Sequence, residues 1–239
     1  MRLRAGTLVE VRPAPEILAT LDADGTLDGL PFMPEMLEYC GRRLLVHRVA
    51  HKTCDTITKT GGRRMRDAVH LEGIRCDGSA HGGCQAACLI FWKSAWLRRV
   101  DGTPAEGLEV SAHPPDEVLR RLPVTRDGES GDAEPRYVCQ ATELLRATTA
   151  LRWWDPRQYV RDLTSGNASV WEFVRVIAIA AFNVLQRKRG GRTYPFTPAP
   201  TARRTPPTRL DLAPGELVRI KPSEEIAATL DTEIGRAHV

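Results

Sequence analysis

Two copies of one stretch organise this chain: Gly6-Thr-Leu-Val-Glu-Val-Arg-Pro-Ala-Pro-Glu-Ile-Leu-Ala-Thr-Leu-Asp22 and Gly215-Glu-Leu-Val-Arg-Ile-Lys-Pro-Ser-Glu-Glu-Ile-Ala-Ala-Thr-Leu-Asp231. In each copy the apolar run after the glycine predicts a strand. The proline ends that strand because proline cannot donate to a ladder, and a short helix is expected after it. This self-similarity indicates that one structural unit begins near Arg4 and begins again near Ala213. We therefore expect the second copy to be cut off before its own body.

The residues between the copies predict an α+β fold. Apolar residues favour strands over residues 42–51, 69–74 and 96–100, and an apolar loop with a helical turn after Pro34 precedes them. A first strand, a long loop and several short strands within about a hundred residues are typical of a small SH3-like β-barrel. Helical spacing over residues 137–150, a cap at Asp155-Pro156 and the capping box Ser169-Val-Trp-Glu172 before residues 173–188 predict helices.

Residue usage divides the chain into five segments. We expect an SH3-like, cysteine-containing β domain over 1–102, a linker over 103–135 with one short helix near 116–122, a helical domain over 136–192, a proline-rich linker over 193–212, and the truncated start of a second barrel over 213–239. Residues 233–239 look like one reading frame of a sequencing-library adapter and are left out of the fold reasoning.

Composition describes an ordinary globular protein and excludes few functions. Of the 239 residues, 42% are hydrophobic and 27% are charged, with a formal net charge of +4. This mild basicity permits nucleic-acid contact without predicting it. No secretory signal is recognised at the start, so we expect a cytoplasmic protein. The apolar run at 176–181 is far shorter than the ~20 residues of a membrane span, which favours a buried helix and no transmembrane segment.

The chemistry of the sequence is concentrated in residues 54–88. Four of the six cysteines lie here, together with a histidine: Cys54, Cys76, His81, Cys84 and Cys88. Thiolates are soft ligands suited to zinc and to iron–sulfur clusters, and disulfides are rare in the cytosol. Glycines 78, 82 and 83 allow a loop to wrap closely around an ion. We therefore predict that the four cysteines converge on one metal or cluster, with His81 as an alternative ligand.

The ligand spacing leaves the cofactor open. The paired Cys-x2-Cys knuckles of zinc ribbons are absent, which favours an iron–sulfur cluster over zinc. Asp55 and Asp77 each follow a candidate ligand and are expected to orient the site through hydrogen bonds, although Asp77-Gly78 is also typical of an ordinary turn. The histidines at 47, 51 and 70 are expected to face solvent. Buried, non-ligating cysteines are the competing interpretation, since free cysteine is among the most buried residue types.

Several strings resemble a bacterial family whose members contain two related cysteine-motif halves joined by a helical segment. The resemblance rests on Gly29-Leu-Pro-Phe-Met-Pro-Glu-Met36, His51-Lys-Thr-Cys-Asp-Thr56, the segment from Arg75 to Lys93, Leu151-Arg-Trp-Trp-Asp-Pro-Arg-Gln-Tyr-Val-Arg-Asp162 and Gly215-Glu-Leu-Val-Arg-Ile-Lys221. It implies the two-copy architecture and a second half that is incomplete here, and it names no reaction.

Three functional hypotheses follow. The first is a metal- or iron–sulfur-binding accessory or electron-transfer protein that serves an unidentified protein partner. The second is a metal-free module that binds protein or nucleic acid, with the protein partner favoured. The third is an enzyme with Cys84 or Cys88 as nucleophile beside His81. Phosphate loops, Gly-x-Ser-x-Gly and His-Glu-x-x-His are absent from the sequence, so no familiar enzyme class is indicated.

Overall fold

The computed structural model describes residues 3–102, 122, 124–126, 136–194, 211–213, 216–223 and 225–226. The chain divides into two compact units, Met1–Val170 and Trp171–Val239, which are considered separately. The short helix expected near 116–122, nearly all of the linker over 103–135 and most of the linker over 193–212 lie outside the described residues. The boundaries expected at 102, 135, 192 and 212 stay predictions.

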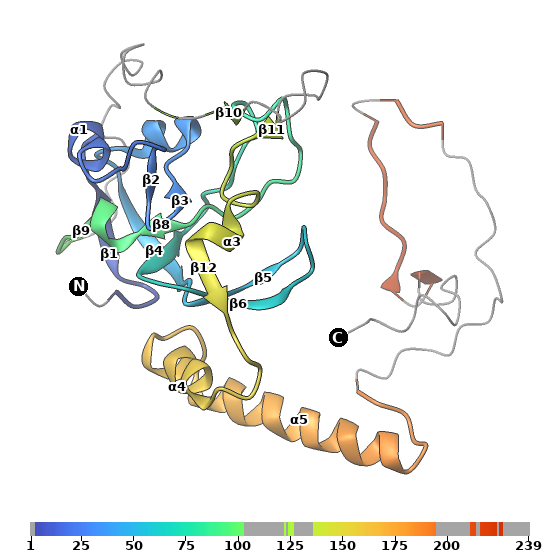
Figure 1. Cartoon of the computed structure of the whole chain (residues 1–239). Helices are drawn as coiled ribbons and strands as arrows, with labels where there is room; N and C mark the ends of the chain where they lie inside the picture. Colours follow the sequence, from blue (N-terminus) through green and yellow to red (C-terminus); the bar gives the residue numbers. More distant parts are fainter. Residues whose placement is uncertain are drawn as a thin grey trace. The chain divides into compact units, whose positions relative to one another are not determined.

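An antiparallel sheet of five strands forms the centre of the first unit (Figure 1). Its order is β8 (Trp92–Lys93), β7 (Ala68–Leu71), β4 (Arg43–Val49), β1 (Leu8–Val11) and β9 (Leu97–Arg99). The strands predicted at 42–51, 69–74 and 96–100 are confirmed as β4, β7 and β9. No pairing joins the edge strands β8 and β9 in the described part of the chain, so barrel closure is not found and the SH3-like barrel stays a prediction.

Aromatic packing attaches the long loop of residues 12–42 to this sheet. The loop contains α1 (Ala14–Leu18), β2 (Thr26–Leu27), β3 (Leu30–Pro31) and the 3-10 helix η1 (Pro34–Tyr39). Phe32 meets Trp92 and Trp96 edge-on at ring-centroid distances of 6.3 and 5.2 Å, and all three side chains are fully buried. Trp96 ends the 3-10 helix η2 (Ser94–Trp96). Because such pairs add to the stability gained by burial, they fix η1 on the sheet.

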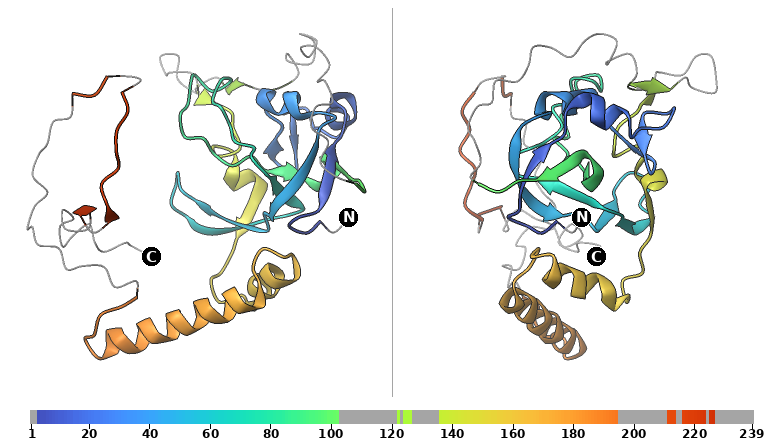
Figure 2. Two further views of the ribbon diagram at one scale, coloured as in Figure 1. Left: turned by 180° about the vertical axis from the view of Figure 1, so that it is seen from behind. Right: turned by 90° about the vertical axis from the view of Figure 1, so that its left-hand side faces the viewer.

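A second antiparallel sheet contains β12 (Thr148–Ala150), β6 (Gly61–Met65) and β5 (Lys52–Asp55) in that order. Its β5–β6 hairpin extends away from the five-stranded sheet in both views (Figures 1 and 2). Cys54 lies opposite Gly62 in this hairpin. The Gly61-Gly62 pair begins β6.

The segment from 136 to 192 is not helical throughout. It starts with β11 (Arg136–Tyr137), which pairs with β10 (Thr125–Arg126), and the predicted helix over 137–150 is reduced to α3 (Leu144–Ala147) followed by β12. The helix α4 (Pro156–Thr164) begins as predicted, with the Asp155 side chain accepting a hydrogen bond from the Arg157 backbone N–H. The fold is thus mixed α+β with a helical segment at its end.

The second unit contains α5 (Val170–Lys188) and the described part of the repeated stretch. No residue of α5 is buried, so the expectation of a buried helix was wrong. In the second copy Leu217, Val218 and Ile220 are exposed, and the described residues there form no strand.

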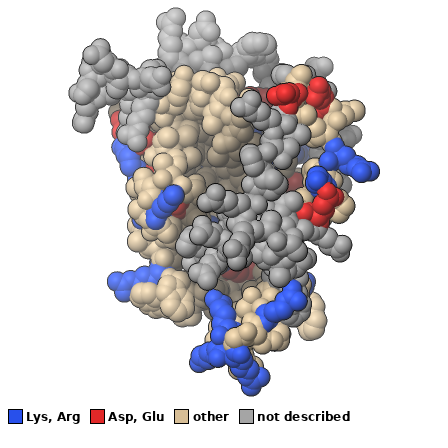
Figure 3. Space-filling view, turned by 90° about the vertical axis from the view of Figure 1, so that its right-hand side faces the viewer, with Lys and Arg blue, Asp and Glu red and all other residues tan. Residues whose placement is uncertain are grey.

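Among the described helices, none combines the length and the apolar character that crossing a membrane requires. On the face in Figure 3, basic side chains form separate groups, with acidic side chains between some of them.

Candidate metal centre

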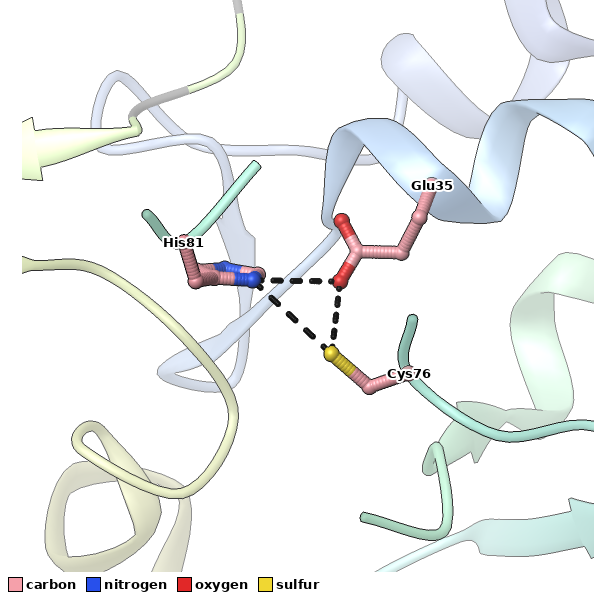
Figure 4. A group of neighbouring side chains, drawn as sticks. All are labelled: Glu35, Cys76 and His81. Atoms are coloured by element: carbon pink, nitrogen blue, oxygen red, sulfur yellow. Dashed lines mark hydrogen bonds and ion pairs between the residues drawn. The ribbon is translucent and has the colours of Figure 1, made fainter. Parts of the chain in front are cut away.

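Glu35, Cys76 and His81 converge in the first unit from two separate segments of the chain (Figure 4). Glu35 lies in the first turn of η1, whose Met36 and Leu37 are buried in the core. Cys76 and His81 belong to the loop that leaves β7 and returns to β8. One potential ligand atom of each residue lies within 4.8 Å of the other two, and no other group of three or more such residues does so in the described part of the chain.

The three distances are those of direct contact. The Cys76 thiol donates to Oε1 of Glu35 at 3.1 Å. Nδ1 of His81 lies 3.4 Å from the same oxygen and 3.8 Å from the Cys76 Sγ. Sulfur, nitrogen and oxygen therefore form the corners of one small triangle.

A backbone carbonyl sets the orientation of His81. Nε2 of the ring lies 3.1 Å from the carbonyl oxygen of Val138. Because that oxygen only accepts, Nε2 is the donating nitrogen, and in the neutral ring Nδ1 presents its lone pair to Glu35 and Cys76. Histidines that ligate metals usually donate their second nitrogen in this way.

The buried Gln140 side chain holds the segment that supplies this carbonyl. Its Oε1 accepts from the Phe91 N–H at 2.7 Å, and its Nε2 donates to the carbonyls of Phe91 and Pro31 at 2.9 and 3.2 Å. One amide thus joins the segment after β11 to β3 and to the residue before β8. Val138 is fixed relative to His81 as a result.

Burial raises the free-energy cost of charge in the centre. The side chains of Glu35 and His81 are 3% and 4% exposed, and Oε2 of Glu35 is buried with no hydrogen-bond partner among the described residues. Desolvation, followed by the hydrogen bond to Glu35, raises the pKa of the Cys76 thiol to about 12. Without a cation the site therefore keeps its thiol protonated, and the unpartnered carboxylate oxygen costs free energy.

The loop closes tightly behind Cys76. The Cys76 N–H donates to the carbonyl of Cys88 at 2.9 Å, which brings the two ends of the loop together. Gly78 has φ +74, and a Cβ there would meet the Cys84 carbonyl oxygen at 1.9 Å. Burial and then the nearby thiols of Cys139 and Cys84 raise the pKa of Cys88. Cys84 and Cys88 therefore lie beside the centre without belonging to its triangle.

Two of the five predicted ligands thus belong to the centre and three do not. Cys76 and His81 lie in the centre, whereas the exposed thiols of Cys54, Cys84 and Cys88 lie outside the group of atoms within 4.8 Å. Cys54 lies on β5 of the three-stranded sheet, while the other candidates follow β7 of the five-stranded sheet. All six cysteines are free. The interpretation of buried, non-ligating cysteines does not fit the three exposed thiols.

The neighbouring polar residues have local roles. Asp55 accepts hydrogen bonds from residues of its own hairpin loop, including Thr58 and Thr60, and Asp77 accepts from Ser79. Each carboxylate therefore orders a turn, which was the alternative considered for Asp77 and was not expected for Asp55. His51, expected to face solvent, is 3% exposed, because α4 covers it through Gln158 and Asp162.

Glu35 was missed by the sequence reasoning because it lies 41 residues before Cys76. A signal was nevertheless present: Glu35 is the one charged residue in Gly29-Leu-Pro-Phe-Met-Pro-Glu-Met-Leu37. A carboxylate inside an apolar run that becomes buried needs a partner.

Comparison with protein-family models, with curated proteins and with solved structures finds no match for this chain. The arguments for function below therefore rest on the residues of the site.

Proposed function

We propose that this protein binds one zinc ion through Cys76, His81 and Glu35, and that the ion holds the loop between β7 and β8 against η1. A tetrahedral zinc site, with sulfur at about 2.3 Å and nitrogen or oxygen at about 2.0–2.1 Å, separates its ligand atoms by roughly 3.3–3.6 Å. The observed separations of 3.1, 3.4 and 3.8 Å bracket this range. Small shifts of the three side chains therefore suffice to place an ion between them.

The buried, unpartnered oxygen of Glu35 is the observation that carries the proposal. A cation between the three side chains would bind Oε1, the oxygen that Cys76 and His81 both approach, and its charge would lower the cost of burying the whole carboxylate. One thiolate, one carboxylate and one neutral imidazole together carry two negative charges, which a divalent ion balances. A bound cation would also lower the pKa of the Cys76 thiol, because a metal-bound thiol loses its proton.

The donor set favours zinc over an iron–sulfur cluster. Sulfur, imidazole nitrogen and carboxylate oxygen are all common zinc ligands, whereas a cluster of four irons takes four thiolates. Cys84 and Cys88 lie in the same loop, and either thiol is suited to the fourth position. Because zinc is redox-inactive, the ion would act structurally in an accessory or binding protein, and electron transfer is not part of the proposal.

The enzyme hypothesis fits the geometry less well. In a nucleophilic triad the histidine uses one nitrogen for the nucleophile and the other for the orienting carboxylate. The hypothesis makes Cys84 or Cys88 the nucleophile, but Nδ1 of His81 faces Cys76 and Glu35, and Nε2 faces a backbone carbonyl. The raised pKa of Cys88 also opposes its use as a nucleophile, which needs a thiolate.

The test is metal analysis of the protein and of matched variants purified without added metal. We expect about one zinc per chain and no visible absorption. Glu35→Gln, Cys76→Ser and His81→Gln should each weaken zinc binding by at least about 100-fold, beyond the 10- to 100-fold loss typical of residues that only orient a ligand. Competition with a chromogenic chelator measures the affinity.

Two matched controls identify the ligands. Glu38→Gln makes the same chemical change on the exposed side of η1, and Cys54→Ser removes an exposed thiol of the other sheet. Both should retain the affinity of the parent protein. Loss of metal in Cys54→Ser would restore the four-cysteine arrangement, and an absorption band from iron–sulfur charge transfer would overturn the choice of zinc. Cys84→Ser and Cys88→Ser, compared with each other, show which thiol completes the site.

A further inference from the structure

A small cavity lies in the first unit where α4 approaches the β5–β6 hairpin, on residues separate from the proposed zinc site (Figure 1). Its volume is about 150 Å³, and it is lined by His51, Arg64, Leu151, Arg157, Gln158 and Arg161. Sites that enclose a whole drug-sized ligand measure roughly 300–1,000 Å³, while a single water needs about 10–15 Å³. The cavity therefore suits one small group.

Positive charge dominates this cavity. Three of its six lining residues are arginines. Arg64 pairs with Asp155, whereas in the described part of the chain neither Arg157 nor Arg161 pairs with a carboxylate. Arg157 and Arg161 are four residues apart on α4, so their side chains leave the same face of the helix. The surplus of positive charge indicates an anionic ligand.

His51 adds a requirement that a simple anion does not meet. Its Nε2 lies 3.2 Å from the Gln158 carbonyl oxygen and 3.3 Å from Oδ1 of Asp162, two acceptors, so Nε2 is the donating nitrogen. Nδ1 is buried, and no residue that the structure describes forms a hydrogen bond with it. The other nitrogen of the neutral ring is an acceptor, and a buried acceptor without a donor costs free energy.

The surroundings of His51 keep its ring neutral. Burial is the largest cause that lowers its pKa, and the charges of Arg161 and Lys52 act in the same direction. Asp162 and the Gln158 carbonyl oppose this shift without overcoming it. Arg64 and Arg157 also line the cavity, and because both are cationic they do not favour the protonated form of the ring. A ligand that offers a hydrogen-bond donor as well as a negative charge would therefore complement both His51 and the arginines.

We propose that this cavity binds a hydrogenphosphate group, with Arg64, Arg157 and Arg161 donating to its oxygens and its hydroxyl donating to Nδ1 of His51. Inorganic phosphate keeps a hydroxyl at neutral pH, and a phosphate monoester keeps one while its second proton is bound. Sulfate carries a similar charge and shape without a hydroxyl at this pH. Comparing the affinities for phosphate and sulfate therefore distinguishes the hydrogen bond to His51 from general attraction to the arginines.

Isothermal titration calorimetry at pH 6 and 0.15 M salt tests the proposal, with inorganic phosphate, O-phosphoserine and sodium sulfate as the three ligands. At this pH about half of the phosphoserine keeps its second proton, and sulfate has none. We expect phosphate or phosphoserine to bind at least about tenfold more tightly than sulfate, since the latter leaves the buried nitrogen without a donor. Tighter binding of phosphate than of phosphoserine would indicate the free ion as the ligand. Tighter binding of phosphoserine would indicate a phosphate monoester. Equal binding of sulfate, or no binding of either phosphate compound, would overturn the proposal.

A pair of arginine variants locates the ligand. Arg157→Gln removes a cation that lines this cavity and not the larger cavity described next, and we expect at least about tenfold weaker binding. Arg4→Gln removes the same charge from a larger neighbouring cavity of about 680 Å³, which it shares with Arg161, and should change the affinity by less than about twofold in screening salt. The reverse pattern would place the anion in the larger cavity and refute the assignment. Unchanged zinc content in both variants shows that they are folded and keeps this result independent of the metal site.

Discussion

At the scale of single residues, the surroundings of Glu35 distinguish the metal-bound and metal-free states most strongly. Cys76 and His81 both approach Oε1, so the three-residue contact leaves Oε2 unsatisfied. An ionised carboxylate buried without compensation costs several kcal/mol. The aromatic packing of Phe32 fixes η1, and the carboxylate is therefore not free to turn toward water. The cation proposed above would lower this cost without rearranging the core.

Gly78 should be essential to the same centre for a steric reason. We expect Gly78→Ala to lower the free energy of unfolding by more than about 2 kcal/mol, because a Cβ would meet the Cys84 carbonyl oxygen at 1.9 Å in addition to the strain of a positive φ. Urea denaturation measures this change. Zinc affinity should fall in the same variant, since the loop that carries Cys76 and His81 must open.

Gly73 provides the control for this substitution. It has the same φ of +74, and nothing lies within 4 Å of a Cβ built there. Gly73→Ala should therefore show the backbone strain alone, about 1–2 kcal/mol, with normal zinc affinity. Equal losses in the two variants would mean that the close approach to Cys84 is unimportant.

Sequence reasoning identified part of the centre and missed the rest for a physical reason. Cys76 and His81 could be predicted as ligands from the sequence because both lie in one glycine-rich loop. Cys54 was grouped with them by its nearness in sequence, but strand pairing places it in the β5–β6 hairpin. Glu35 joins the centre only through the packing of η1 on the sheet, which no local pattern records.

At the scale of elements, pairing partners decided which predictions were confirmed. The apolar runs of β4, β7 and β9 predicted strands correctly because they bury side chains against one core. Helical spacing at 137–150 was misleading, since Thr148 to Ala150 pair with Met65 to Arg63 across β6. Thr148 to Ala150 thus form a strand because a partner exists, a tertiary effect that overrides local propensity.

The start of α4 offers a prediction at this scale. Asp155 caps the helix by accepting from the Arg157 N–H at 3.0 Å and also pairs with Arg64. Asp155→Ala should cost about 0.5–2 kcal/mol of stability, as loss of an N-cap does. Asp155→Asn retains a capping side chain and loses only the partly exposed ion pair, so it should cost less than about 1 kcal/mol. Urea denaturation of both variants gives the comparison, and an equal loss would show that the ion pair matters more than the cap.

At the scale of the molecule, both proposed sites belong to the first unit. The zinc centre uses η1 and the loop between β7 and β8, and the anion cavity uses the β5–β6 hairpin and α4. Each site combines segments that are distant in sequence, so each forms only when the whole unit folds. Ligands that bind the folded state alone stabilise it by mass action. Zinc and phosphate should therefore both raise the midpoint of unfolding.

Mild acid should destabilise the whole unit through two histidines. Burial is the largest cause that lowers the pKa of both His51 and His70. Their unfolded-state pKa lies near 6.5, so below that pH the unfolded chain binds protons that the folded chain does not, and unfolding becomes more favourable. The stabilisation is complete above the unfolded value and is lost as the pH falls through the folded-state value.

We therefore expect the free energy of unfolding in urea to fall between pH 7 and pH 5, compared only at pH values where the zinc content is unchanged. The carboxylates with lowered pKa, such as Glu10 and Asp22, act in the same direction but at lower pH, because their ordinary values are 4.5 and 3.8. His70→Phe should flatten the slope, since it removes one titrating ring that stacks on Phe91 and approaches the Ile90 carbonyl. A profile that is level from pH 7 to pH 5, or a slope that the variant leaves unchanged, would show that these buried rings do not govern the response to acid.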